Sequence, residues 1–232
     1  MFSLKHSARL FTLALVIKSV TALAAGMVPE TSLLLINEQD KGGSINVKNT
    51  DPHPSLLYTN IVDLPDDKGV HLTPTQPVTR VEPDQTQQLR FILTTDAPLT
   101  TEHLKRVTFE GIPPKTKSDH SHVAINIRQD LPVLIHPANL PVIKDAWTLL
   151  KWSASGNTLT VHNDSPYVVR LSEQVVAQPS GAMMKLSRTY ILPGQTLTAK
   201  SKQSLEGDGQ LKFFPASRYG IQVASYTAPL SK

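Results

Sequence analysis

The side chains with the greatest capacity for chemistry in this sequence are few and scattered. Asp119, His120 and His122 form a short cluster of residue types that ligate zinc. No further ligand follows at the spacing of a zinc site, so the cluster is interpreted as a polar turn. The sequence therefore predicts no metal site.

Two carboxylates, Glu82 and Glu102, could in principle form an acid–base pair. Glu82 instead begins a Glu-Pro-Asp turn signal. The sequence has no Gly-x-Ser-x-Gly, no phosphate-binding glycine loop and no His-Glu-x-x-His. Trp147 and Trp152 bracket one expected strand and are assigned to a core. We therefore expect a protein that is not an enzyme and that uses no cofactor.

The first 24 residues resemble a secretory signal peptide. Lys5 and Arg9 give it a positive start, Leu10–Ile17 is its apolar run, and Ala22–Ala24 is its small-residue cleavage signal. A membrane anchor is the weaker interpretation, because the apolar run is too short to span a bilayer. No later stretch is long and apolar enough to insert into a membrane.

Removal of this segment changes the charge balance. Three of the 23 Lys and Arg residues leave with it and none of the 19 acidic residues does, which leaves 20 positive charges against 19 negative ones. A nucleic-acid partner therefore has little support. The chain also has no cysteine, so its domains must be held by ordinary hydrophobic cores.

The remaining sequence consists of short β-rich runs separated by Pro, Gly, Asn and Asp. We expect about seven strands in the first roughly 110 residues after the signal, which is the spacing of a β-sandwich. The second half has the same pattern of short β-rich runs between turns, and its expected strands include Trp147–Trp152, Met183–Tyr190 and Tyr219–Ser225. Leu72–Pro77 is expected to be a loop, and Pro137–Pro141 a stiff linker between two domains.

One long strand is expected within the stretch His122–Pro137. Val123, Ile125 and Ile127 alternate with smaller or polar residues, which is the period-two pattern of a strand with one apolar face. Pro132 cannot donate to a β-ladder, so the strand is expected at a sheet edge. A long apolar edge strand either adds a strand to a partner or is covered by a loop of its own chain, and the stretch alone leaves both open.

Several segments in order resemble the PapD-like periplasmic pilus chaperones of the short-loop type. The segment Thr73–Arg90 resembles the family's loop, strand and Glu-Pro turn, and Phe109–Lys115 resembles the end of strand F in the first domain. Asn163–Tyr167 and Ile191–Gly194 resemble the Asn-x-(Ser/Thr)-Pro-Tyr and Leu-x-Pro segments of the second domain.

This resemblance implies an all-β fold of two immunoglobulin-like sandwiches in an L or boomerang arrangement. The expected parts are a signal peptide at 1–24, an N-terminal domain at 25–137 and a C-terminal domain at 138–232. It also implies a chaperone that binds pilus subunits by donor-strand complementation and delivers them to an outer-membrane usher. Val123, Ile125 and Ile127 would enter the subunit. When free, the protein is expected to be a monomer or to self-associate weakly.

The sequence departs from the family where an Arg and a Lys bind the subunit's terminal carboxylate. Ser32 and Pro132 occupy those positions. Arg128 and Arg106 are the replacement candidates, and Arg128 would need a bulge or twist around Asp130–Pro132 to reach the required face.

The family's acid–Arg–acid network between domains is also altered. Glu102, His136 and Arg218 stand at the matching positions, with His136 and Arg218 as further candidate cations.

Two other functions remain open from the residues alone. A structural fibre subunit would carry a short N-terminal donor segment ahead of one pilin domain. A secreted carbohydrate-binding or enzymatic sandwich would need an aromatic platform or a carboxylate pair in a cleft, and only 6% of residues are aromatic.

Overall fold

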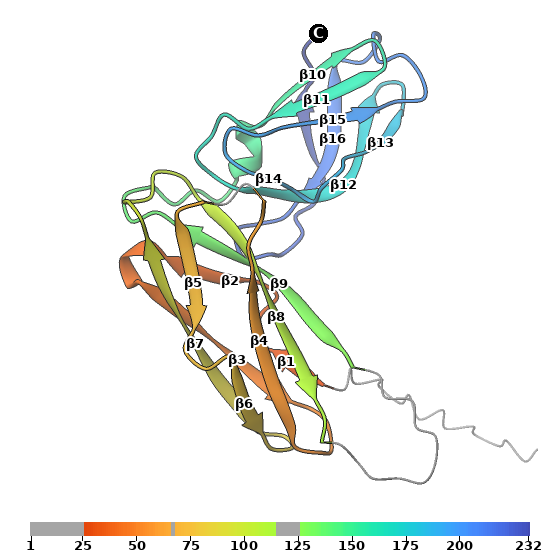
Figure 1. Ribbon diagram of the computed structural model, residues 1–232. Coiled ribbons are helices and arrows are strands. Elements are labelled where there is room, and N and C mark those ends of the chain that lie inside the picture. The colour runs from red at the N-terminus through yellow and green to blue at the C-terminus, as the bar shows by residue number, and fades with distance from the viewer. Residues whose placement is uncertain (1–25, 66–67, 115–125) are drawn as a thin grey trace, which may run out of the picture.

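The computed structural model describes residues 26–65, 68–114 and 126–232. The signal segment, the cluster of Asp119, His120 and His122, and both Val123 and Ile125 lie outside these ranges. Two β-sandwiches meet at an angle near the middle of the chain (Figure 1). No helix in the described ranges is long and apolar enough to cross a membrane.

The N-terminal sandwich has two sheets, with strand orders β1-β3-β7-β5 and β2-β9-β8-β4-β6. Alternation explains the packing of its strands: in β7 the side chains of Leu89, Phe91 and Leu93 are buried while their neighbours are exposed. The structure gives these bounds: β1 (Met27–Pro29), β2 (Leu34–Asn37), η1 (Glu38–Asp40), β3 (Gly42–Asn49), β4 (Ser55–Val62), β5 (Val70–Pro74), β6 (Val78–Val81), β7 (Thr86–Thr95), β8 (His103–Ile112) and β9 (Arg128–His136).

The first stretch of chain contributes to both sheets of this sandwich. β1 pairs with β3 in the antiparallel direction, and β2 then crosses to the other sheet and pairs with β9 in parallel. The parallel pairing runs from Leu34 opposite Val133 to Asn37 opposite His136. Hence β2 occupies one side of β9 only from Val133 onward.

The long strand predicted from the sequence differs from β9 in two ways. Within the described residues the strand begins at Arg128, so Ile127 precedes it. The predicted edge position is wrong for Val133–His136, because β2 covers that side. The predicted edge position is correct for Arg128–Pro132. Along these residues β9 pairs with β8 on one side, and no strand in the described part of the chain pairs with its other side. Pro132 is the last residue before the parallel pairing starts.

The C-terminal sandwich has one sheet in the order β10-β11-β15 and a second in the order β13-β12-β16-β17, with β14 also paired to β12. Trp152 and Phe213 pack against each other in its core in a tilted arrangement, with ring centroids 5.2 Å apart. The bounds are η2 (Ala146–Leu149), β10 (Lys151–Ser155), β11 (Thr158–His162), β12 (Val169–Gln178), β13 (Met183–Lys185), β14 (Tyr190–Ile191), β15 (Thr196–Lys200), β16 (Gln210–Pro215) and β17 (Tyr226–Pro229).

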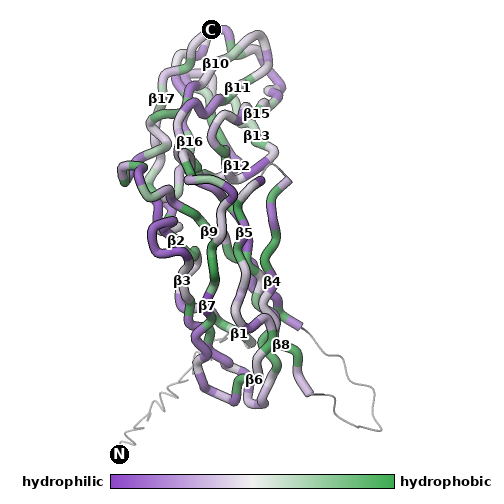
Figure 2. Tube along the Cα trace, turned by 60° about the vertical axis from the view of Figure 1, so that its left-hand side comes forward, coloured by the Kyte–Doolittle hydropathy of each residue, from purple (hydrophilic) through white to green (hydrophobic). Residues whose placement is uncertain are grey.

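A small apolar cluster joins the two sandwiches. β9 is an apolar segment that leads up to this junction (Figure 2). Tyr167 donates a hydrogen bond of 2.7 Å from its hydroxyl to the carbonyl of Pro141, which ties the connecting segment to the second sandwich. Burial raises the pKa of the Tyr167 phenol and the charge of Glu102 adds to this, so the hydroxyl keeps its proton as a donor. The buried members of the cluster are Leu33, Leu64, Leu104, Leu134, Val168 and Leu192.

Candidate functional site

The strand β9 presents two different faces because its side chains alternate. Leu131, Val133 and Ile135 point into the N-terminal core. The residues between them point outward, and Leu134 among these belongs to the cluster between the sandwiches. The pairing of β9 with β8 is continuous from His103 opposite Ile135 to Glu110 opposite Arg128.

Ile127 is the one predicted donor residue within the described ranges. Its side chain is 40% exposed, and its Cβ lies 3.9 Å from where a Cβ on Gly26 would stand. Ile127 is separated from Leu131 and Val133 by an even number of residues, so in an extended chain its side chain lies on the same face as theirs. Val123 and Ile125, the other two predicted donor residues, lie outside the described ranges.

The two predicted anchor cations are on the outward face and both have acidic partners. Arg106 Nε donates to Asp130 Oδ1 at 2.7 Å, and its Nη2 donates to the Asp130 carbonyl at 3.0 Å. Arg128 Nε lies 3.4 Å from Glu110 Oε2. The β8–β9 register does not shift around Asp130–Pro132, so the structure has no bulge there of the kind that Arg128 would need to reach the other face. Arg128 therefore stays on the outward face, beside Glu110.

An exposed apolar patch lies on the same sheet and was not singled out from the sequence. In β4, Leu56 is 43% and Tyr58 is 40% exposed, while Leu57 between them is fully buried. Leu56 is paired with Ile112 in β8, and Tyr58 with Val78 in β6, and both partners are also exposed. The sequence does carry a sign of this patch, because the consecutive residues Leu56, Leu57 and Tyr58 place large apolar side chains on both faces of one strand. We call Leu56, Tyr58, Val78 and Ile112 the outer patch.

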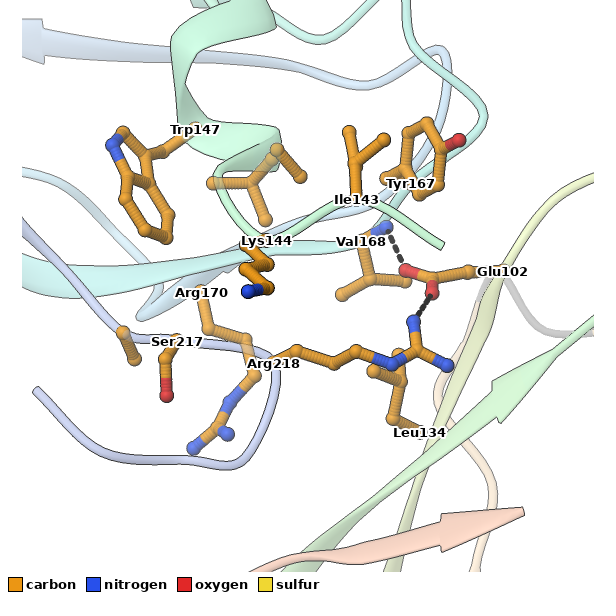
Figure 3. A pocket seen from close by; sticks show the side chains of 13 residues that line it. Glu102, Leu134, Ile143, Lys144, Trp147, Tyr167, Val168, Arg170, Ser217 and Arg218 are labelled. Atoms are coloured by element: carbon orange, nitrogen blue, oxygen red, sulfur yellow. Dashed lines mark hydrogen bonds and ion pairs between the residues drawn. The ribbon is translucent and has the colours of Figure 1, made fainter. Parts of the chain in front are cut away.

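The structure brings Glu102, His136 and Arg218 together at the junction of the sandwiches. Glu102 Oε1 accepts from Arg218 Nη1 at 2.7 Å and lies 2.8 Å from His136 Nδ1. Its other oxygen, Oε2, accepts from the backbone N–H of Val168 at 2.9 Å (Figure 3). The side chains of all three residues are at least nine-tenths buried.

The hydrogen bonds of His136 tie this network to the connecting segment. Nε2 faces the carbonyl of Leu140 at 2.9 Å and therefore carries a proton, since a carbonyl only accepts. Nδ1 lies 3.2 Å from Arg218 Nη1 as well as close to Glu102. A proton on Nδ1 is donated to Glu102, and without it Nδ1 accepts from Arg218. Both states keep the two sandwiches linked.

A cavity of about 30 Å³ adjoins this network. It is lined from both sandwiches, by Glu102 and Leu134 on one side and by residues of the C-terminal sandwich on the other. Such a space admits a water molecule. Among the described residues there is no group of three or more His, Cys, Asp and Glu that could hold a metal ion.

Family models match both halves of the chain. The model described as "Pili and flagellar-assembly chaperone, PapD N-terminal domain" matches residues 26–141. The model described as "Pili assembly chaperone PapD, C-terminal domain" matches residues 145–227.

Individual relatives point the same way. The chain is 51% identical over 213 residues to the "Uncharacterized fimbrial chaperone YhcA" of Escherichia coli K12, which covers 91% of this chain and 94% of the relative. It is 26% identical to the "Probable fimbrial chaperone YfcS" of the same strain, over 86% of this chain and 82% of that protein.

Solved structures with similar folds include the YadV chaperone, with a TM-score of 0.72 and 20% identity over 88% of this chain and 99% of that one. The SafB chaperone of Salmonella enterica, solved in complex with the SafA pilin, also has a TM-score of 0.72, with 18% identity over 90% of this chain and 98% of the matched chain. These likenesses confirm the predicted all-β fold of two immunoglobulin-like domains.

Proposed function

Because the chain belongs to the PapD family of pilus-assembly chaperones, we propose that it binds pilus subunits in the periplasm, keeps them competent for assembly and delivers them to an outer-membrane usher. The family is one of chaperones and not of enzymes. The observation that carries the proposal is the open side of β9 along Arg128–Pro132, where a strand from another protein can pair.

The chemistry of this binding is donor-strand complementation. A subunit domain that lacks one strand exposes a groove, and the chaperone fills the groove with the side chains of Val123, Ile125 and Ile127. Each buried aliphatic side chain stabilises the complex by about 1.5–3 kcal/mol. Main-chain hydrogen bonds along the open side of β9 supply the remaining contacts without regard to the subunit's sequence.

The outer patch lies on the sheet that contains β9 and gives the subunit a second, apolar surface to pack against. Monomeric proteins seldom keep adjacent large apolar side chains exposed without a partner. In the solved SafB complex the bound protein is the SafA pilin. We propose a pilin-like subunit as the partner of this chain as well.

The test replaces Ile127 by Asp and measures capture of an epitope-tagged pilus subunit co-expressed in the periplasm. We expect capture to fall by more than about tenfold, because a carboxylate would enter an apolar groove. Circular dichroism should remain that of the wild type. The matched control is Ile92→Asp on β7, where Ile92 is 53% exposed on the opposite sheet. Equal capture by Ile127→Asp and Ile92→Asp would disprove the donor-strand mechanism.

A further inference from the structure

The network at the junction of the sandwiches contains an imidazole, His136, whose two ring nitrogens face different partners. Nε2 donates to the Leu140 carbonyl, while Nδ1 lies 2.8 Å from Glu102 Oε1 and 3.2 Å from Arg218 Nη1. An imidazole gains or loses a proton between about pH 5 and pH 8, whereas an arginine in its place would stay charged throughout. The total charge of this buried network therefore changes with pH.

The three side chains of the network come from different sandwiches. Glu102 precedes β8 and His136 ends β9, so both belong to the N-terminal sandwich, while Arg218 follows β16 in the C-terminal one. The contact between His136 and Glu102 lies within one sandwich. Among the contacts of these three side chains with one another, only those of Arg218 cross the junction.

Without a proton on Nδ1, Arg218 has two acceptors in the N-terminal sandwich. Its Nη1 carries two N–H groups, of which one is donated to Glu102 Oε1 at 2.7 Å and the other can be donated to His136 Nδ1. Two acceptors with no proton between them repel, so Nδ1 and Oε1 move slightly apart while Arg218 bridges them. The charges of Glu102 and Arg218 then cancel.

With a proton on Nδ1, Arg218 is held less firmly. Nδ1 then donates to Glu102 Oε1 and no longer accepts from Arg218, so one bond across the junction is lost. The imidazolium also places a second positive charge 3.2 Å from Arg218 Nη1. All three side chains are almost completely buried, and in such surroundings like charges at this distance repel strongly.

The groups around the adjoining cavity do not compensate the added charge. Lys144 and Arg170 line this cavity, and Glu102 is the only acidic residue among the described residues that line it. Tyr167 also lines it and stays neutral, since burial raises the pKa of its phenol.

The groups on the side of the N-terminal sandwich do not compensate it either. Glu38 follows β2, the strand that pairs with the end of β9, and its two carboxylate oxygens accept from the backbone N–H groups of Leu99 and Ala138. His103 follows Glu102 in the chain, and its protonation would add a further positive charge. Acid therefore leaves Glu102 facing an excess of positive charge.

We propose that His136 makes the junction an acid-sensitive joint, in which a second proton on the ring deprives Arg218 of an acceptor and loosens the hold of one sandwich on the other. At higher pH the joint is stiff, and in mild acid the angle between the sandwiches varies more widely. Such coupling is reciprocal, so a partner that fixes the angle also favours release of this proton. The inference concerns this chain alone and does not rest on the proposed function.

The test measures the distance between two spin labels, one on each sandwich, in the mature chain. Because the chain has no cysteine of its own, Gln88→Cys on β7 and Thr198→Cys on β15 supply two specific, exposed attachment sites. Distance distributions are recorded by pulsed electron paramagnetic resonance at about pH 8 and about pH 5, which bracket the titration of an imidazole. We expect the population outside the main distance peak to rise by about tenfold at the lower pH.

Two substitutions assign the effect to His136. His136→Gln has no titratable ring, so its distance distribution should be the same at both pH values. His71→Gln removes an exposed imidazole elsewhere in the N-terminal sandwich and should respond to pH as the labelled parent does.

A measurement on the unlabelled wild-type chain needs no substitution at position 136. Val168 N–H donates to the same carboxylate that faces the ring of His136. In nuclear magnetic resonance spectra, the ring signals of His136 and the backbone N–H signal of Val168 should therefore shift with one common midpoint as the pH is lowered.

The inference would be overturned by equal distance distributions at the two pH values in the labelled parent, by a narrower distribution in acid, or by an unchanged pH response in His136→Gln. If His136→Gln does not fold, different titration midpoints for His136 and Val168 would overturn it as well.

Discussion

Two buried asparagines, one in each sandwich, stabilise turns in the same way: each side-chain amide donates to two backbone carbonyls. Asn49 donates from Nδ2 to the carbonyls of His53 and Val81. Asn163 donates from Nδ2 to the carbonyls of Tyr167 and Ile191. Both side chains are completely buried, so each amide depends on these protein carbonyls and not on water for its hydrogen bonds.

Replacement of Asn163 by Ala should lower the free energy of unfolding by about 2–4 kcal/mol. The reason is that the carbonyls of Tyr167 and Ile191 lose their donor inside the protein. Urea denaturation monitored by tryptophan fluorescence measures the change. The control Asn157→Ala, in an exposed turn, should stay within about 0.5 kcal/mol of the wild type. A similar small change in both variants would contradict the role given to Asn163.

Residue types predicted some parts of the site and missed others for physical reasons. Glu102, His136 and Arg218 were found through their places in sequence motifs. Arg170 was not, because an arginine within an alternating strand is normally an exposed residue on the outer face. Only the packing of the two sandwiches shows that its Nη1 is buried and without a partner in the described structure.

At the scale of elements, alternation predicted strands well where a neighbouring strand was available. It failed at Tyr219–Ser225, where the alternating residues form a turn: Gly220 N–H bonds to the Ser217 carbonyl, and Ser217 N–H bonds to the Ile221 carbonyl. Part of the expected strand Trp147–Trp152 is instead the 3-10 helix η2. The strand β17 begins directly after the wrongly predicted strand Tyr219–Ser225. The loop predicted at Leu72–Pro77 overlaps β5, a strand at a sheet edge that ends at Pro74. Proline is tolerated at such an edge, so its presence did not exclude a strand.

The outer patch yields a prediction about the sheet that contains β9. The double substitution Leu56→Ser and Tyr58→Ser should weaken capture of a pilus subunit by about tenfold, because the two side chains lose apolar contact with the partner. Stability should change by less than about 1 kcal/mol, since both side chains are already substantially exposed.

The comparison for this prediction is Ile92→Ser, an exposed apolar residue on the opposite sheet. Pull-down of an epitope-tagged subunit gives the binding, and urea denaturation gives the stability. If the double variant captures as much subunit as Ile92→Ser does, the outer patch is not part of the binding surface.

At the scale of the whole molecule, the relative placement of the sandwiches depends on the network around Glu102. Its carboxylate accepts from Arg218 and from Val168 N–H in the C-terminal sandwich, and its backbone N–H donates to the Pro166 carbonyl at 2.7 Å. The small apolar cluster supports the same junction. Together these contacts hold the two sandwiches at one angle to each other.

Glu102→Gln should lower the free energy of unfolding by about 3–5 kcal/mol, because Arg218 would then lack its buried counter-charge. Small-angle scattering should show a wider distribution of shapes. The exposed residue Glu206 supplies the control Glu206→Gln, which should change neither quantity. An unchanged scattering profile together with wild-type stability would mean that the linker and the apolar cluster set the angle alone.

The crossing of the chain from one sheet to the other between β1 and β2 has a consequence for guest selection. β2 closes that side of β9 from Val133 onward, so a guest strand that runs in the direction of β2 along the open side must end there, and it is aligned from its end and not from its beginning. Each extra residue at that end would displace the whole guest by about 3.3 Å and turn its apolar side chains to the wrong face. On the proposed function, the chaperone therefore measures where a subunit's last strand ends, and guests with different lengths of chain before that strand are aligned alike.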